Sequence, residues 1–230
     1  MKQVYIGIFA HPDDESFGPS GTLALAIKNG ADVHLICATA GQNGTNPDDH
    51  EDLGEIRNEE WLAAGKLLGA KTQHQLWYLD GELNNHYFPQ IAADCQAIIE
   101  SIAQEYDEKT EFTVITMDQN GISGHIDHIV MSFVSSFVFV KLRATDKRLK
   151  ALHYFCVPEE VLPQADTSFV FRSKGRPASQ IDITNDISEV FELKKQIMRA
   201  HYSQRGDAEM LIARAESAPS LTENFYIYKD

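Results

Sequence analysis

The chain has 230 residues, 43% of them hydrophobic, which is enough to bury one sizeable core. Its formal net charge is −14, from 34 acidic and 20 basic residues, and because a surface this acidic repels polyanions, nucleic acid and anionic membranes are not expected as partners. No stretch approaches the roughly 20 apolar residues of a membrane-spanning helix, and the amino terminus lacks the long apolar region of a signal peptide. The cytoplasm is therefore the expected compartment.

Three cysteines, Cys37, Cys95 and Cys156, are scattered through apolar or helical stretches. Their odd number and spacing indicate small buried thiols in a reducing compartment rather than a disulfide framework. No CxxC pair occurs, which disfavours a zinc site built from cysteines.

Short apolar runs rich in β-branched or aromatic residues alternate with longer stretches of helical spacing. In chain order, this pattern predicts strands at 4–10, 32–39, 74–79, 112–117 and 149–157. Between them, it predicts helices at 21–29, 53–68, 88–106 and 127–142. Such alternation favours a Rossmann-like α/β fold, in which a mostly parallel sheet is covered by helices on both faces through right-handed crossovers.

The pattern becomes irregular after residue 158. Strands are expected at 168–171 and 180–183, a long helix at 187–202, and a last strand at 225–229. Because no linker-like composition marks a boundary, we expect a single domain over 1–230, with the part from about 158 as an elaboration of that same domain.

Large side chains supply the expected core. Trp61, Trp77 and the phenylalanines at 129–140 are predicted to be buried. The basic turn at 172–177 and the acidic run at 48–52 are predicted to be solvated loops, and the acidic run is also placed to cover a cleft.

The first chemically unusual segment is AHPDDE, directly after the first predicted strand. His11, Asp13, Asp14 and Glu15 crowd ionisable groups at the carboxyl end of that strand, where open α/β sheets carry their active sites. Imidazole and carboxylate together suit zinc, and a bound cation offsets the repulsion between the carboxylates. The competing interpretation is a turn with a helix N-cap, which explains one carboxylate but not three.

The second segment is GHIDHI, after the fourth predicted strand. His125 and His128 are three residues apart, and both can turn toward the sheet edge if Asp127 opens a helix. His128 would then complete a site with His11 and Asp14, which gives three protein ligands and one open position, as in catalytic zinc sites. An isolated HxxH is more often a surface pair, but two such segments at strand ends argue against coincidence.

These motifs give the chain a family resemblance. AHPDDE at 10–15 and GHIDH at 124–128 are joined by TAG at 39–41, a helix containing Arg57, and AHYSQ at 200–204. With them the chain resembles the PIG-L/LmbE-like family of zinc-dependent de-N-acetylases. The resemblance implies a hydrolase that removes an acetyl group from the amide nitrogen of an N-acetylglucosamine-type sugar or glycoconjugate.

The resemblance also assigns the centre of the site. It implies that His11, Asp14 and His128 bind Zn²⁺, although the ligand set also accepts another divalent ion such as Fe²⁺. Asp13 would be the general base that takes the proton of the attacking water. His125 would stabilise the tetrahedral intermediate or protonate the leaving amine.

Further positions are implied around that centre. Asp127 would tune His125, and Arg57 would hold a polar or anionic part of the substrate. Gln42 stands where many relatives have glutamate, so it is expected to hydrogen-bond the substrate without a charge. His201 is expected either in a structural role or at the edge of the substrate, and direct participation in the chemistry stays open.

Two other functions remain open at this level. A metal-dependent phosphoesterase also uses His/Asp clusters, but it would need a second metal and further bridging carboxylates. A non-catalytic zinc-binding protein would normally close its site with four ligands, and only three are identified. A nucleotide site is rejected because HPDDE stands where a glycine-rich phosphate loop would be needed. The sequence leaves homo-oligomerisation open.

Overall fold

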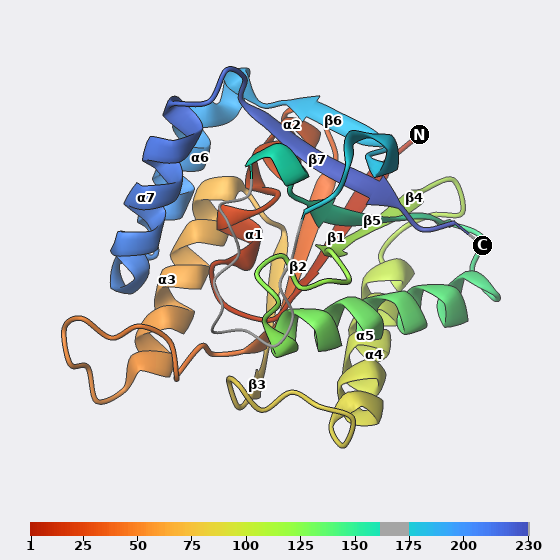
Figure 1. Ribbon diagram of the computed structural model, residues 1–230. Coiled ribbons are helices and arrows are strands. Elements are labelled where there is room, and N and C mark those ends of the chain that lie inside the picture. Colours follow the sequence, from red (N-terminus) through yellow and green to blue (C-terminus); the bar gives the residue numbers. More distant parts are fainter. Residues whose placement is uncertain (162–174, 230) are drawn as a thin grey trace.

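A seven-stranded sheet runs through the molecule (Figure 1), in the order β3-β2-β1-β4-β5-β7-β6. The computed structural model of the chain describes residues 1–161 and 175–229. The strands are β1 (Gln3–Phe9), β2 (Asp32–Thr39), β3 (Thr72–Tyr78), β4 (Glu111–Met117), β5 (Leu149–Cys156), β6 (Ile183–Asp186) and β7 (Thr222–Ile227). β1 to β5 are parallel, whereas β7 is antiparallel to both of its neighbours. The predicted mostly parallel α/β sheet is confirmed.

Helices connect the strands. They are α1 (Asp14–Phe17), α2 (Ser20–Lys28), α3 (Leu53–Leu68), α4 (Phe88–Gln104), α5 (Ile126–Arg143), α6 (Phe191–Arg199) and α7 (Arg205–Glu216). Short 3₁₀ turns occupy Glu159–Val161, Ala178–Gln180, Ser188–Val190 and Tyr202–Gln204. Among the described residues, no helix is long and apolar enough to cross a membrane.

Helices cover both faces of the sheet (Figure 1). Ile6 points to the face where Ile91 of α4 and Val134 of α5 pack. The opposite face buries Leu35 against Trp61 of α3, together with parts of α2 and α6. This two-sided burial is the reason that the parallel strands read as nearly continuous apolar runs.

The described residues after 175 add β6 and β7 to the edge of the same sheet. The strand predicted at 180–183 lies further on, at β6, because a 3₁₀ turn precedes it. The helix predicted at 187–202 is α6, with a 3₁₀ turn on either side. The strand expected at 168–171 lies outside the described residues. α7 has no counterpart among the predicted elements.

The predicted core is confirmed only in part. Trp61 and Phe139 are each 1% exposed, but Trp77 is 48% exposed and both Phe133 and Phe137 are 50% exposed. The prediction was wrong for Phe133 and Phe137 because α5 is apolar around most of its circumference, yet only one side of it meets the sheet. It was wrong for Trp77 because a left-handed backbone at the end of β3 turns the indole outward. The three cysteines are buried and free, as predicted.

Candidate metal centre and active site

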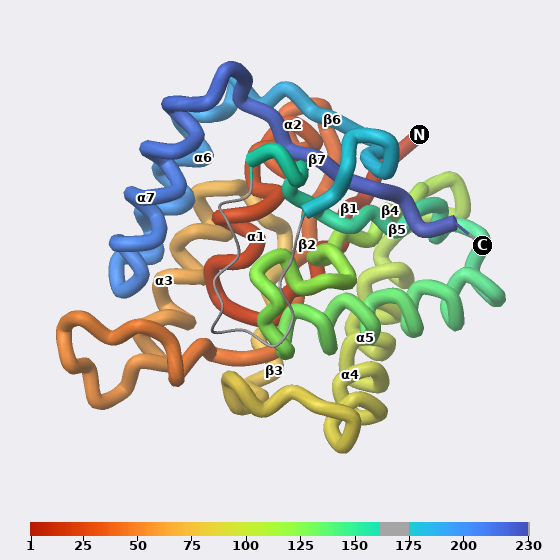
Figure 2. The backbone as a smooth tube through the Cα atoms, in the orientation of Figure 1, coloured from red at the N-terminus to blue at the C-terminus, as the bar shows by residue number. Residues whose placement is uncertain are grey.

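Three predicted ligands meet at the carboxyl ends of two neighbouring strands. His11 and Asp14 follow β1, and His128 lies in the first turn of α5 after β4, the strand that pairs with β1. His11 Nδ1 lies 2.9 Å from His128 Nε2, and Asp14 Oδ1 lies 3.1 Å from the same nitrogen. Figure 2 shows the segment after β1 passing beside the start of α5.

A backbone carbonyl group on the side away from His11 orients the ring of His128. Its Nδ1 lies 3.0 Å from the carbonyl oxygen of Gly121, so this nitrogen carries the proton and the Nε2 lone pair faces His11. Gly121 has a φ of 73°, and a Cβ there would lie 2.8 Å from the carbonyl oxygen of His125. Glycine therefore permits the turn that supplies this carbonyl.

Two further carboxylates, those of Asp80 and Asp127, lie beside the other ring nitrogen of His11. Its Nε2 lies 2.9 Å from Asp80 Oδ1 and 3.4 Å from Asp127 Oδ2. Burial lowers the pKa of His11, but Asp127 and Asp80, together with the charge of Asp14, outweigh burial and raise that pKa to about 10. Asp80 was not predicted, although it follows the carboxyl end of β3 just as the other site residues follow their strands.

These contacts show that the residues fit a metal ion. His11 Nε2 is buried beside the carboxylates of Asp80 and Asp127 without an aligned hydrogen bond, and His11 Nδ1 lies 2.9 Å from the lone pair of His128 Nε2. Such a cluster suits a shared proton or a metal cation. Asp14 Oδ2 accepts the backbone N–H groups of Ala10 and His11, which directs Oδ1 to the cluster. Burial raises the pKa of Asp14, but the charges and hydrogen bonds of His128 and His11 together outweigh burial and keep that pKa below its usual range.

His125 belongs to the same cluster but is oriented differently. It lies close enough to His11 and His128 to form a three-histidine group that could also hold an ion. Its Nδ1, however, accepts the backbone N–H of Asp127 as the N-cap of α5, so the neutral ring carries its proton on Nε2. Burial and the positive charges of the neighbouring histidines lower the pKa of His125. A neutral N–H donor is therefore the form that this environment favours.

Asp13 is paired with Arg57. Arg57 Nη2 donates to Asp13 Oδ2 at 2.8 Å, and Nη1 donates to the carbonyl oxygen of Gly41 at 2.8 Å. Burial raises the pKa of Asp13 to about 6, against the opposing charge of Arg57. Arg57 is only 4% exposed. The structure thus places Arg57 against Asp13, and its predicted contact with substrate stays a prediction.

Asp127 is fully buried and holds the loop after β3. Its two carboxylate oxygens accept the backbone N–H groups of Gly81, at 2.7 Å, and Leu83, at 3.1 Å. Its charge also raises the pKa of His125, although burial has the larger effect on that ring. The hydrogen bonds therefore go to the loop, and the nearest imidazole nitrogen is His11 Nε2.

His201 lies behind the centre and is fully buried. Its Nε2 is 2.8 Å from Ser16 Oγ, which donates to Glu15 Oε1 at 2.7 Å. As placed, the ring has no exposed surface, and a contact between His201 and substrate stays a prediction. The ring supports the turn that carries Asp13 and Asp14.

Gln42 lies at the other side of the site, in the loop at 41–52. Its Nε2 is 3.4 Å from the carbonyl oxygen of Tyr78, and its buried Oε1 has no hydrogen-bond partner among the described residues. The acidic run at 48–52 is anchored at one residue, because Asp48 forms a bidentate ion pair with Arg205.

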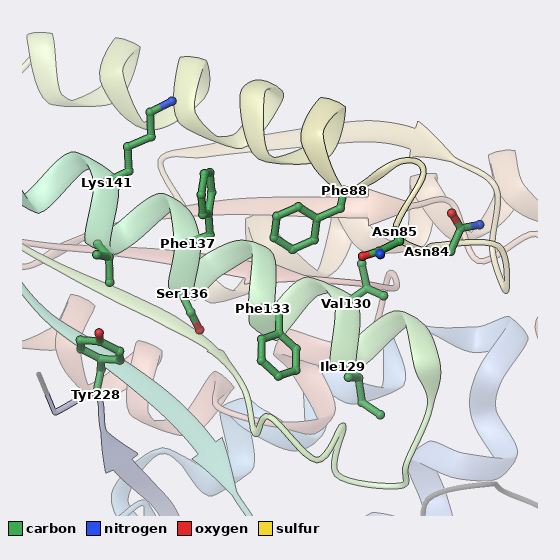
Figure 3. Close-up of a pocket in the computed structure, with 11 residues that line it drawn as sticks. Asn84, Asn85, Phe88, Ile129, Val130, Phe133, Ser136, Phe137, Lys141 and Tyr228 are labelled. Carbon is green, nitrogen blue, oxygen red and sulfur yellow. The ribbon is translucent and has the colours of Figure 1, made fainter.

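A hollow of about 610 Å³ lies away from the His/Asp cluster, between α4 and α5 (Figure 3). Phe88 from α4 meets Phe137 from α5 there, with ring centroids 5.8 Å apart, and Phe133 lines the same hollow. It contains none of the His/Asp cluster, so it is not the candidate catalytic site.

Residues 6–138 match the family profile described as "PIG-L: GlcNAc-PI de-N-acetylase". A similar protein, "Probable N-acetyl-alpha-D-glucosaminyl L-malate deacetylase 2" of Bacillus cereus, is 27% identical over 89% of this chain and 84% of its own length. A "1D-myo-inositol 2-acetamido-2-deoxy-alpha-D-glucopyranoside deacetylase" of Saccharomonospora viridis is 30% identical over 86% of this chain and 83% of its own length.

Solved structures share the fold. The N,N'-diacetylchitobiose deacetylase of Pyrococcus horikoshii superposes with a TM-score of 0.70 at 21% identity, covering 98% of this chain and 83% of its own. GalB of Pseudomonas putida, a 4-carboxy-2-hydroxymuconate hydratase, superposes with a TM-score of 0.69 at 16% identity, covering 100% and 97%. Because one neighbour is a hydratase, the fold alone does not define the reaction.

The match at 6–138 spans more than half of the chain and contains the turn after β1, the Arg57 helix and the first turn of α5. These are the elements that carry the His/Asp cluster. The chain belongs to the PIG-L family of de-N-acetylases.

Proposed function

We propose that this protein is a zinc-dependent hydrolase that removes the acetyl group from the amide nitrogen of an N-acetylglucosamine-type glycoconjugate. The observation that carries the proposal is the meeting of His11, Asp14 and His128. His128 Nε2 lies 2.9 Å from His11 Nδ1 and 3.1 Å from Asp14 Oδ1, and Asp13 is next in the chain to Asp14. The relatives named as deacetylases of N-acetylglucosaminyl conjugates support the substrate class.

His11, Asp14 and His128 would hold the ion. Zinc bound there supplies Lewis-acid chemistry, since it polarises an amide carbonyl and lowers the pKa of water. Three ligands leave room for water and substrate, which separates this site from a structural zinc site with four protein ligands.

Asp13 takes the proton from the attacking water. The adjacent Arg57 fixes the orientation of its carboxylate, while burial keeps its pKa close enough to neutrality for it to accept a proton and pass it on. The proton then goes to the leaving amine, because an amine anion is a poor leaving group. The Nε2–H of His125 donates to the oxyanion of the tetrahedral intermediate.

The phosphoesterase alternative depends on a second metal ion. His11, Asp80 and Asp127 form a second group whose ligand atoms lie within 4.8 Å of one another. Both oxygens of Asp127 accept backbone N–H groups, however, and Asp80 Oδ1 faces the outer nitrogen of His11. These contacts favour an orienting role, so we propose one metal ion per chain.

Metal content and product release test the proposal together. The metal-free protein is titrated with zinc in steps, and acetate and free amine are measured with the methyl glycoside of N-acetylglucosamine. Small steps are needed because a fold neighbour, a teicoplanin deacetylase, is described in a zinc-inhibited form. Activity should reach its maximum at one equivalent. Two equivalents together with release of phosphate from phosphate esters would favour the phosphoesterase.

Asp13→Asn tests the base. The variant should bind zinc with the wild-type stoichiometry and lose at least about 100-fold in kcat, since a positioned general base contributes 10²–10⁴-fold. Full activity in a variant that still binds zinc would refute the assignment of Asp13.

A further inference from the structure

Trp77 has a backbone conformation that is unusual for a bulky residue. Its φ is 63°, in the left-handed region, and it stands at the end of β3, where the register with β2 shifts. Such a conformation costs about 1–3 kcal/mol for a non-glycine residue, and it concentrates at functional sites. Here the indole is turned outward and is 48% exposed, whereas Trp61 is 1% exposed.

The indole forms one wall of a pocket of about 300 Å³, a volume at the lower end of the range for small-molecule sites. The other walls come from the segment at 40–55. Gln42 contributes the buried Oε1 atom that lacks a hydrogen-bond partner, and Asp52 and Glu55 contribute exposed carboxylates. None of the described residues that line this pocket is lysine or arginine.

The pocket and the metal centre lie at the same end of the sheet, on strands β3 and β1. Tyr78 is level with Thr39 on β2, and Thr39 donates its backbone N–H to Ala10, the residue before His11. Trp77 therefore stands two strands away from the His11 turn, which corresponds to about 10 Å at the usual spacing of about 4.8 Å. A ring joined to a sugar at the centre would reach this distance.

We propose that Trp77 and this pocket bind a second, neutral, hydroxyl-bearing ring joined to the acetamido sugar. This inference rests on the proposed function and specifies its substrate class. The C–H face of such a ring packs on the indole, and its hydroxyl groups donate to Gln42 Oε1 and to the carboxylates of Asp52 and Glu55.

Charge argues against an anionic second group. A carboxylate there would meet Glu51, Asp52 and Glu55 with no lysine or arginine in the pocket, and the nearby Arg57 already pairs with Asp13. His50 also lines the pocket, but its Nε2 lies 3.8 Å from the carboxylate of Asp48. Of the relatives described above, one is named for a malate conjugate and the other for an inositol conjugate. The pocket fits the second kind, a polyhydroxylated ring.

The kinetic test compares matched substrates. These are the methyl glycoside of N-acetylglucosamine, a carboxymethyl glycoside, and glycosides bearing a second hexose or cyclitol ring, each as both anomers. The measured quantity is the ratio of kcat/KM for the ring-bearing substrate to that for the methyl glycoside. We expect this ratio to fall about fivefold in Trp77→Ala, which is the scale of one aromatic contact. Trp77→Phe, which keeps an aromatic ring, should retain most of it.

Two further variants test whether the change in the kcat/KM ratio comes from loss of the indole, from strain in the backbone at residue 77, or from loss of any exposed apolar side chain. Trp77→Gly removes the indole but tolerates the left-handed φ, so it should lower the ratio as Trp77→Ala does without a fold penalty. Leu62→Ala, at a 44% exposed position on α3, should leave the ratio at its wild-type value.

Fluorescence gives a readout that does not depend on turnover. The chain has two tryptophans, and Trp77 is the exposed one, so acrylamide quenching reports mainly on this indole. Ring-bearing glycosides should protect it, whereas the methyl and carboxymethyl glycosides should not, and Trp77→Phe supplies the background.

The outcomes separate the two proposals. Protection without release of acetate would keep the pocket and refute the deacetylase. Acetate release with an unchanged ratio in Trp77→Ala, or with equal protection by the carboxymethyl glycoside, would refute the neutral-ring pocket and keep the deacetylase.

Discussion

Asp80 holds His11 from the side opposite the proposed metal ion, with its carboxylate oxygen 2.9 Å from His11 Nε2. Replacing Asp80 with Asn removes the charge that makes the imidazole a stronger ligand, so we expect zinc affinity to fall about 10–100-fold. Competition against a chromophoric chelator measures this. Asp182→Asn, at a carboxylate that pairs with Lys229 far from the centre, should bind zinc like the wild type. Equal affinities in the two variants would contradict the orienting role of Asp80.

His34 makes stability depend on pH. It is fully buried, with Nδ1 2.7 Å from Thr72 Oγ1 and Nε2 2.9 Å from the Tyr106 hydroxyl, and burial lowers its pKa to about 4. As pH falls below about 6.5, the unfolded chain takes up a proton that the folded chain refuses, so the free energy of unfolding decreases until about pH 4. His34→Gln should flatten that slope in urea unfolding series, whereas exposed His86→Gln should not.

At the scale of an element, the turn after β2 packs its backbone directly against the side chain of Arg57. A Cβ at Gly44 would lie 2.1 Å from Arg57 Nη1, and the guanidinium cannot swing away without losing its hydrogen bond to Asp13. Gly44→Ala should therefore lower kcat/KM by at least about tenfold, through a displaced base, with zinc binding intact.

Gly206→Ala is the matched control for that substitution. Nothing lies within 4 Å of a Cβ at Gly206, in the first turn of α7, so alanine there should raise stability by up to about 1 kcal/mol and leave turnover unchanged. A fully active Gly44→Ala would show that the turn tolerates a shifted Arg57.

The parallel strands and the ligand turns could be predicted because their signals are local and strong. Apolar runs bounded by turns indicated β1 to β5, and the polar segments at their carboxyl ends indicated where chemistry would gather. His11 and His128 were predicted on this basis to lie together, and the structure brings their nitrogens within 2.9 Å.

Other features depend on tertiary contacts that a sequence does not contain. α7 was missed because it buries only Ala208 and Ile212, too few apolar positions to give a helical period. Trp77 was expected in the core because bulky aromatic residues usually are, whereas a left-handed backbone turns it outward. The packing of Arg57 against Asp13 depends on two glycines that leave room for it, which no pairwise spacing reveals.

For the whole molecule, a bound metal ion should stabilise the fold. Zinc at 100 times its dissociation constant adds about 2.7 kcal/mol to the free energy of unfolding, which corresponds to a rise of about 5–10 °C in Tm for a chain of this size. Calorimetry with and without chelator measures this. His128→Ala should show little difference between the two conditions, and a chelator effect equal to that of the wild type would contradict its place among the ligands.

His11 and His128 are 117 positions apart, and the strands that precede them are neighbours in the sheet. During translation, β2 and β3 leave the ribosome before β4, so the nascent chain carries two of the three proposed ligands for several seconds before the third exists. Ion capture must therefore wait until β4 has docked beside β1. In a cell short of zinc, newly made enzyme would fold first and be loaded afterwards.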